Sequence, residues 1–286
     1  MASKMQAVQF DLRQKKISLV EVNIPSSTDR LDVVVKVQYA GVCGTDLHIV
    51  EGAFPCNSSP FILGHEFCGI VSFVGSDVKH VRPGDNVVVD PESGCETCNY
   101  CHGGNYQHCK NGGLNNAVGM YRNGGWAQYC RVPAAQVYKL PSNIPLDQDT
   151  GFDIVTPQEL KKYRSKDEDW GVDLVIDCSG YAPAMEEALK YVNPGGKLCI
   201  FGVSSPTATM QVSPYDIFKY ELSIIGININ PFSFPKALNW IQVMGERYLS
   251  FEKLGIKTFS LDQYEDALQS LKKGIIAKAV FKIDHN

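Results

Sequence analysis

A thiol, an imidazole and a carboxylate occur in two short glycine-containing stretches of the sequence. The first stretch is residues 41–48 and the second is residues 63–66. A catalytic zinc ion uses three protein ligands and leaves its fourth position to water or substrate, so Cys43, His65 and Glu66 are candidate ligands. A Gly-His-Glu triplet on its own also fits a turn beside a structural histidine.

Three further polar residues accompany these candidate ligands. Asp46 is a candidate acceptor for the free ring N–H of His65, and such a partner fixes the tautomer of the imidazole. Thr45 and His48 are placed to carry a proton away from a molecule bound to the metal. The two stretches therefore predict a catalytic metal site with a route for a proton.

Four cysteines form the most specific motif of the chain. Their spacing is Cys95-x2-Cys98-x2-Cys101-x7-Cys109, inside a loop rich in glycine and asparagine. Four thiolates this close can bind one tetrahedral Zn²⁺ with no open position, as structural sites do. Four unrelated cysteines are one alternative, and a [4Fe–4S] cluster is another. Zinc is favoured because the fourth cysteine lies in the same lobe and no redox context accompanies the motif.

Two patterns of secondary structure divide the chain. Up to about residue 140, short alternating runs and turn signals predict the strands of a compact β domain. These runs are 5–10, 17–22, 32–39, 69–74, 86–90 and 127–132. Beyond residue 145, apolar runs alternate with helical patterns, which predicts a parallel sheet with right-handed crossovers. The expected strands there are 172–177, 197–202 and 222–227, and the expected helices are 182–192 and 235–245. A helix at 261–274 and a strand at 277–283 would close the chain.

The composition is that of an ordinary globular enzyme. The 286 residues are 44% hydrophobic and 20% charged, which suits one or two domains with a large core. A net charge of −4 and a pI near 5.9 argue against nucleic acid and membranes as partners. No signal-peptide pattern and no membrane-spanning run is evident, and ten cysteines then favour reduced thiols and metal. The expected location is cytoplasmic.

Together, these motifs resemble the zinc-dependent medium-chain alcohol dehydrogenases. The branch they are most similar to is the polyol group, which includes relatives of sorbitol, arabinitol and threonine dehydrogenases. The resemblance covers nearly the whole chain. It rests on the two metal stretches, the four cysteines and three further segments, which are residues 82–87, 123–129 and 277–283.

The resemblance implies an α/β protein with a GroES-like catalytic domain and a Rossmann-type nucleotide-binding domain. The catalytic domain would span residues 1–148 and be completed by 254–286, and residues 149–253 would form the second domain. In such enzymes zinc lowers the pKa of a bound hydroxyl, and a hydride passes to a nicotinamide held beside it. The implied catalytic-zinc ligands are Cys43, His65 and Glu66, the structural-zinc ligands are Cys95, Cys98, Cys101 and Cys109, the proton-relay positions are Thr45 and His48, and the carboxylate behind the ligands is Asp46.

The sequence departs from the family where a Rossmann domain binds its coenzyme. The turn G-x-G-x-x-G between the first strand and helix is absent. Gly195 and Gly196 are no substitute, because they follow an expected helix and precede an expected strand. In the family, the first βαβ unit of the nucleotide-binding fold follows the position of Gln148. Here residues 149–157 follow instead, and they resemble the strand that comes after this missing unit. One βαβ unit takes about 30 residues or more, so the second domain is expected to be incomplete.

A few coenzyme contacts would remain. Ser179 and Gly180 match a family turn near the adenine side, Gly202 and Val203 match one near the nicotinamide, and Lys278 matches a basic position near the coenzyme. A strand end, a glycine turn and a surface lysine explain these residues equally well. Without the missing strands, the apolar runs 172–176 and 198–200 should have an exposed face and unpaired edges. A less stable second domain, or one completed by a partner subunit, is therefore expected.

The sequence thus predicts a zinc-dependent oxidoreductase that oxidises a secondary alcohol or polyol by hydride transfer to NAD or NADP. Such a protein would have a small-molecule substrate and form a homo-oligomer. A shortened, catalytically impaired zinc-binding isoform that acts through intact subunits is the alternative. A zinc-lobe interaction module unrelated to redox chemistry is a third reading, although such a module needs no open metal position. The sequence does not distinguish NAD from NADP or identify the alcohol.

Overall fold

The computed structural model describes residues 3–26, 29–140, 156–167 and 170–285. The chain divides into two compact units, Met1–Asp149 with Asn230–Asn286, and Thr150–Ile229. Of the segment 149–157, expected to resemble the strand after the missing unit, residues 149–155 lie outside the described residues, and Thr156 and Pro157 begin a helix. Among the described helices, none is both long and apolar enough to cross a membrane.

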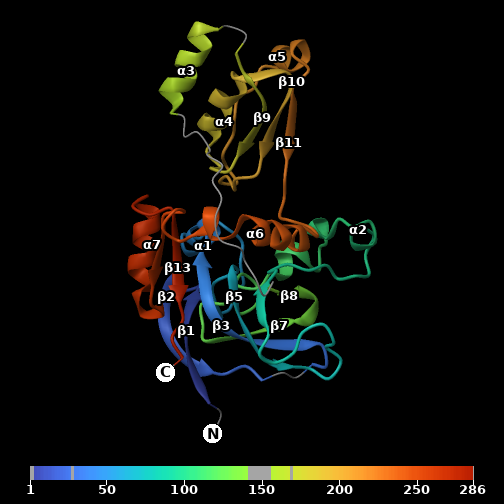
Figure 1. The fold of residues 1–286 in the computed structure, drawn as a ribbon, viewed down its shortest axis with the longest axis vertical. Helices are drawn as coiled ribbons and strands as arrows, with labels where there is room; N and C mark the ends of the chain where they lie inside the picture. The colour runs from blue at the N-terminus through green and yellow to red at the C-terminus, as the bar shows by residue number, and fades with distance from the viewer. Residues whose placement is uncertain (1–2, 27–28, 141–155, 168–169, 286) are drawn as a thin grey trace. The chain divides into compact units, whose positions relative to one another are not determined.

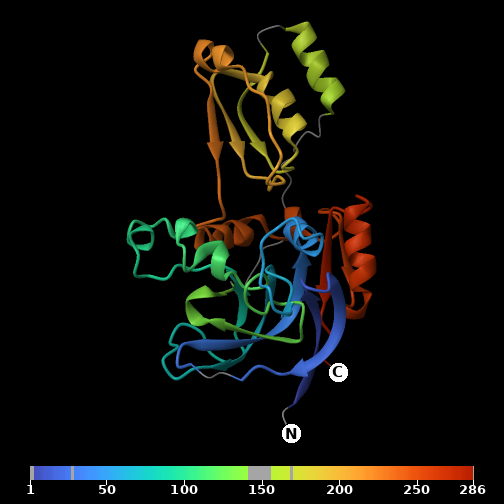
Figure 2. The ribbon, with the colours of Figure 1, turned by 180° about the vertical axis from the view of Figure 1, so that it is seen from behind.

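The first unit is a β domain, as the alternating runs predicted, and its strands pair antiparallel except for β12 and β13, which are parallel. A seven-stranded sheet has the order β12-β13-β3-β5-β6-β8, with β7 paired to the other part of β3, and a smaller sheet has the order β2-β1-β4. The long β1–β2 hairpin is dark blue in Figure 2. The strands of this unit are β1 Lys4–Asp11, β2 Lys16–Asn23, β3 Asp32–Val42, β4 Phe61–Ile62, β5 Phe67–Val74, β6 Asn86–Val89, β7 Tyr129–Pro133, β8 Val137–Lys139, β12 Ile256–Phe259 and β13 Lys278–Lys282.

Strand β3 lies at the centre of this unit (Figure 1). It pairs with β5, β7 and β13, and its residues Val33, Val35 and Val37 are fully buried. Val and Ile suit such a position because branched side chains pack well on a pleated surface. The core around β3 therefore fixes the ends of β3 and β5, where the candidate metal ligands lie.

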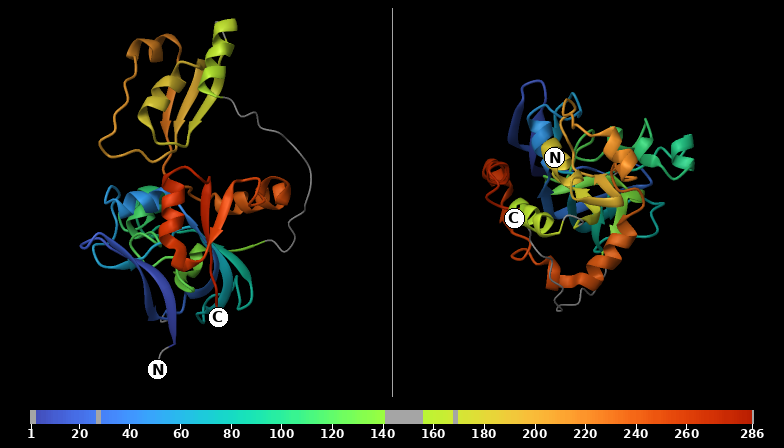
Figure 3. Two further views of the ribbon diagram at one scale, coloured as in Figure 1. Left: turned by 90° about the vertical axis from the view of Figure 1, so that its left-hand side faces the viewer. Right: turned by 90° about the horizontal axis from the view of Figure 1, so that it is seen from above.

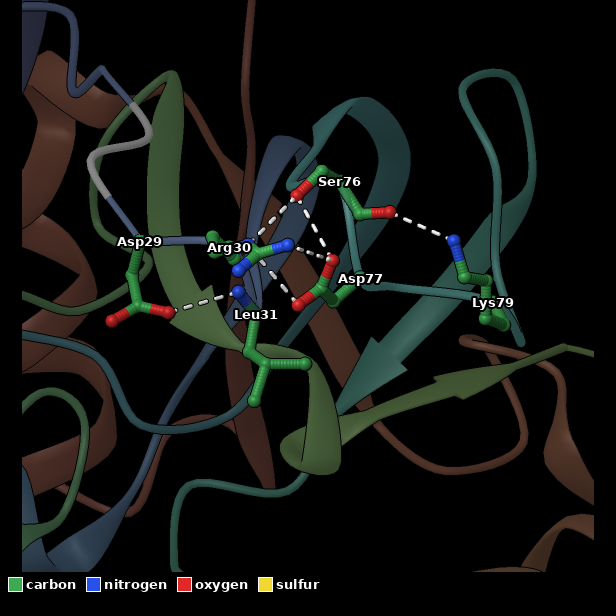
Figure 4. A network of polar contacts seen from close by, with 6 residues as sticks. All are labelled: Asp29, Arg30, Leu31, Ser76, Asp77 and Lys79. Atoms are coloured by element: carbon green, nitrogen blue, oxygen red, sulfur yellow. Dashed lines mark hydrogen bonds and ion pairs between the residues drawn. The ribbon is translucent and has the colours of Figure 1, made fainter.

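A polar network joins the loop before β3 to the loop after β5 (Figure 4). The guanidinium of Arg30 lies 3.2 Å from a carboxylate oxygen of Asp77 and donates to the Ser76 hydroxyl. The Asp77 backbone N–H donates to the Arg30 carbonyl over 2.9 Å, and Lys79 donates to the Ser76 carbonyl over 2.8 Å. Exposed ion pairs contribute little stability, so this network mainly fixes how the two loops meet.

Short helices and the longer α6 complete the first unit. Helix α6 belongs to it, although the sequence-based boundary at residue 254 assigned that helix to the second domain. Phe234, the first residue of α6, stacks on Tyr138 of β8, and Phe232 packs edge-on against Tyr106. The helices are α1 Gly44–Val50, α2 Asn99–His102, η1 Tyr106–His108, η2 Gly113–Asn116, η3 Ala134–Gln136, α6 Phe234–Leu249, η4 Leu261–Gln263 and α7 Tyr264–Lys272.

The second unit contains a parallel sheet of the order β11-β10-β9 (Figure 3). This confirms the predicted α/β class. Asn193–Gly196 was expected to end a helix, but it lies inside β10, where the register shifts between Val192 and Lys197. The elements of this unit are α3 Pro157–Lys166, β9 Val172–Asp177, α4 Ala182–Leu189, β10 Val192–Ile200, α5 Pro214–Lys219 and β11 Ser223–Gly226.

The parallel sheet has one covered and one open face. With the right-handed crossovers that parallel strands normally have, the order β11-β10-β9 places α4 and α5 on one side of the sheet, and Leu198 of β10 is fully buried. On the other side Leu174 is 51% and Ile176 is 56% exposed, and Ile225 in the same row as Ile176 is 40% exposed. Parallel sheets are normally covered on both faces. Within the described residues, the apolar face expected from the missing unit is therefore present.

Candidate active site

Cys43 is positioned by the end of β3 and the start of α1. It directly follows β3 and is the extended N-cap residue of the helix. A carboxylate oxygen of Asp46, in the first turn of α1, accepts the backbone N–H of Cys43 over 2.8 Å. This contact suits a helix start, where backbone donors lack partners inside the helix.

His65 and Glu66 directly precede β5, the antiparallel neighbour of β3. Ala40 pairs with Phe67, and the backbone N–H of Gly41 donates to the Glu66 carbonyl over 2.7 Å. This register brings the end of β3 beside the start of β5. The thiol of Cys43, a ring nitrogen of His65 and a carboxylate oxygen of Glu66 consequently lie within 4.8 Å of one another. The three ligands proposed from the sequence thus converge on one point.

The environment of His65 favours a positive charge at its ring, whether a proton or a metal ion. Its Nδ1 lies 3.4 Å from the other carboxylate oxygen of Asp46, and both atoms are buried without an aligned hydrogen bond. Burial lowers the pKa of His65, but the Asp46 carboxylate and Cys43 outweigh burial and raise the pKa well above its usual value. With Nδ1 facing Asp46, Nε2 remains for a metal. A thiol, an imidazole and a carboxylate form a donor set that zinc accepts, so these residues fit the ion.

Glu66 has a second partner that sequence reasoning did not connect to it. Lys278 of β13 lies with its Nζ 2.5 Å from Oε2 of Glu66. Pairing of Ala279 with Val42 brings this lysine to the end of β3. A Cβ atom on Gly41 would come within 2.4 Å of the same carboxylate oxygen. Glycine at this position therefore leaves room for the ion pair. Lys278, predicted to contact the coenzyme, lies at the candidate metal centre.

The predicted proton-relay residues lie on α1. The Cys43 thiol is 3.7 Å from the hydroxyl of Thr45, which is buried. His48 follows three residues later and is partly exposed, so it lies on the same side of the helix as Thr45. The order from buried hydroxyl to partly exposed imidazole is the order that a proton route to solvent needs.

The four cysteines of the lobe also converge. Their sulfur atoms lie within 4.8 Å of one another, with Cys98 and Cys101 3.6 Å apart. Hydrogen bonds from Thr97 lower the pKa of Cys95 to about 6, whereas burial raises the pKa of Cys101 to about 11, so without metal the thiolate is favoured at Cys95 and disfavoured at Cys101. Helix α2 of this lobe has no buried residue. The donor set fits a closed tetrahedral zinc site, and the lobe has little apolar packing of its own.

Two buried carboxyls between the clusters were missed by sequence reasoning. Asp90 is 3% and Glu92 is 6% exposed. Burial raises the pKa of Asp90 to about 6, although the Glu92 N–H and the Tyr106 hydroxyl lower it. Burial and the Asp90 carboxylate raise the pKa of Glu92 to about 7, against the lowering effect of His65. The available signal was the place of Asp90 directly after the apolar strand β6, with Glu92 two residues later.

Glu92→Gln is expected to stabilise the protein at pH 8 by about 1–3 kcal/mol but to have little effect at pH 5. The folded pKa of Glu92 lies above its unfolded value, so the folded state binds more protons between about pH 4.5 and 7. Ionisation of this carboxyl therefore costs stability as the pH rises through that range. Urea unfolding at both pH values and equal zinc would measure the difference. Glu96→Gln, at an exposed site in the same lobe, is the control, and a pH-independent effect of Glu92→Gln would contradict the prediction.

The remaining predicted coenzyme residues lie at the carboxyl ends of β9 and β10. The Ser204 hydroxyl donates to the Gly180 carbonyl over 2.8 Å, so the two turns that contain Ser179–Gly180 and Gly202–Val203 meet. The backbone N–H groups of Ser179 and Gly180 both donate to the Asp177 carboxylate over 3.0 Å. Ligands of open parallel sheets bind at this edge, but these two donors already have a partner.

Comparison with known proteins agrees with the geometry. A sequence model of the alcohol dehydrogenase GroES-like domain matches residues 29–142, and a model of zinc-binding dehydrogenases matches residues 145–243. The chain belongs to the zinc-binding alcohol dehydrogenase family. The first unit is accordingly a GroES-like β domain and the parallel sheet is of the Rossmann type. The family recognised from the sequence motifs is confirmed.

Several members of this family are similar over nearly their whole length. D-arabinitol dehydrogenase 1 of Uromyces fabae is 24% identical, with 94% of each chain covered. L-threonine 3-dehydrogenase of Pyrococcus furiosus is 27% identical, with 99% of this chain and 100% of the relative covered. The crystal structure of a zinc-binding dehydrogenase from Sinorhizobium meliloti 1021 bound to NADP matches with a TM-score of 0.82 and 25% identity, over 98% and 99% of the two chains.

The alignments also show that this chain is shorter than its relatives. The match to the threonine dehydrogenase runs over 360 positions, whereas the chain has 286 residues. The difference means that at least 74 positions have no residue of this chain. This agrees with the absence of a G-x-G-x-x-G turn from the sequence and with the open face of the parallel sheet.

Proposed function

We propose that this protein oxidises a secondary alcohol or polyol by hydride transfer to NAD⁺ or NADP⁺. The convergence of Cys43, His65 and Glu66 in a GroES-like domain carries the proposal. Relatives that act on arabinitol and threonine support an alcohol substrate. A zinc ion held by these residues would polarise the alcohol oxygen as a Lewis acid.

The surrounding residues each have a task that follows from their contacts. Asp46 accepts the Cys43 backbone N–H and faces Nδ1 of His65, so it orients both ligands. The Thr45 hydroxyl, beside the Cys43 thiol, is placed to take the proton of the substrate hydroxyl and pass it towards His48. Lys278 holds the Glu66 carboxylate and balances its charge.

Zinc analysis with Cys43→Ala would test the proposal. Wild-type protein is expected to hold two zinc ions per chain, one in each donor cluster, and Cys43→Ala is expected to hold one. Polyol-dependent reduction of NAD⁺ or NADP⁺, assayed at millimolar coenzyme, should fall at least about 100-fold, because a Lewis acid contributes several kcal/mol. Cys56→Ala, outside both clusters, is the control. One zinc ion in wild-type protein would contradict the assignment of Cys43, His65 and Glu66.

A second candidate function follows from the missing positions. We infer as the alternative that the chain is a shortened zinc-binding isoform, which is impaired in catalysis and acts through association with intact subunits. Such a chain would bind two zinc ions but give no turnover at any coenzyme concentration. Restoration of turnover by an added full-length subunit of the same family would support this alternative.

A further inference from the structure

The indole of Trp126 touches both segments that carry the candidate metal ligands. Its Nε1 donates to the Gly41 carbonyl over 3.0 Å, two residues before Cys43. A Cβ atom on Gly64, the residue before His65, would lie 2.1 Å from Cδ1 of the same ring. Trp126 is fully buried and is the largest such side chain in the described structure.

The backbone on either side of the indole is fixed as well. The Trp126 N–H donates to the Leu63 carbonyl over 3.0 Å, and its carbonyl accepts the Val8 N–H over 2.8 Å. Gly64 has a φ of +91°, a conformation that favours glycine, so the loop before His65 can lie flat against the ring. The ring of Phe281, on the strand that carries Lys278, packs edge-on at 5.0 Å.

We infer that Trp126 is a positioning residue that holds Cys43 and His65 at the separation needed to bind a metal. The inference rests on the proposed metal site. An indole in contact with both segments limits their movement apart, and its N–H fixes the carbonyl of Gly41. Residues that contact the ligands of a metal ion, and not the ion itself, commonly contribute 10–100-fold to the metal affinity. A tryptophan that only filled the core would affect stability without changing one metal site selectively.

Cobalt substitution can separate these two roles, because Co²⁺ bound by four thiolates and Co²⁺ bound by mixed ligands have different visible spectra. In Trp126→Phe, which keeps an aromatic ring but lacks the N–H, Co²⁺ affinity of the Cys43 site is expected to fall about tenfold. The spectrum of that site should shift, and the four-cysteine site in the same molecule should be unchanged. Val33→Ala, at the far end of β3, is the control for a loss of core packing alone.

Each outcome of the titration decides one question. An unchanged spectrum and affinity of the Cys43 site in folded Trp126→Phe would overturn the positioning role. Equal losses in Trp126→Phe and Val33→Ala would also overturn it, because core packing would then explain both. If Trp126→Phe does not fold, Trp126→Tyr, which also lacks the indole N–H that reaches Gly41, is titrated in the same way. Wild-type protein with Co²⁺ only at the four-cysteine site would instead refute the proposed function.

Discussion

Replacing Cys98 with serine is expected to remove one of two zinc ions per chain and to unfold the cysteine lobe. The four sulfur atoms lie within 4.8 Å of one another, and structural zinc sites contribute roughly 10–16 kcal/mol of binding free energy to folding. The lobe has few buried apolar side chains to replace that contribution, since α2 contains none and η1 contributes Tyr106. Its order should therefore depend on the metal.

The change can be measured by zinc analysis and limited proteolysis. Cleavage between residues 92 and 118 should become much faster in Cys98→Ser, whereas the remaining zinc should stay at the Cys43 site. Cys178→Ser, at an exposed cysteine in the second unit, should keep both zinc ions and the wild-type cleavage pattern. A Cys98→Ser protein that retains two zinc ions would show that the lobe does not hold a four-cysteine site.

Local sequence signals predicted most of what lies around the two candidate metal sites. The four cysteines are close in sequence, so their spacing alone limits them to one lobe. Alternating valines identified β3, and β3 with β5 determines where Cys43 and His65 meet. The roles expected for residues whose spacing is not distinctive, such as Thr45, are supported by the resemblance to a known family and stay predictions.

Features that depend on long-range register were not predictable in the same way. The Glu66–Lys278 ion pair requires β13 to pair with β3, and a shift of one residue would turn Lys278 to the other face of the sheet. The raised pKa of Glu92 depends on burial that no local pattern reveals. Helix α6 belongs to the first unit, where its Phe234 stacks on Tyr138, and this contact joins distant parts of the chain.

Coenzyme binding is where the largest loss relative to an intact Rossmann domain is expected. In such domains the pyrophosphate sits on the N-terminus of the first helix and a carboxylate binds the ribose. This chain has no G-x-G-x-x-G turn, and the N–H groups of Ser179 and Gly180 already donate to Asp177. Loss of two or three charge-assisted hydrogen bonds, at about 1.5–3 kcal/mol each, weakens binding on the order of 10²–10⁶-fold.

Isothermal titration of the zinc-loaded chain with NAD⁺ and NADP⁺ should therefore give dissociation constants in the millimolar range or weaker. Zinc analysis of the same sample ensures that weak binding is not the result of unfolded protein. Micromolar binding of either nucleotide would contradict the prediction and show that the turns after β9 and β10 are sufficient. Millimolar binding with turnover would support a dehydrogenase that requires high coenzyme concentrations. Two bound zinc ions without heat or turnover would favour the shortened isoform, because the metal centre would then be intact while its hydride acceptor has no site.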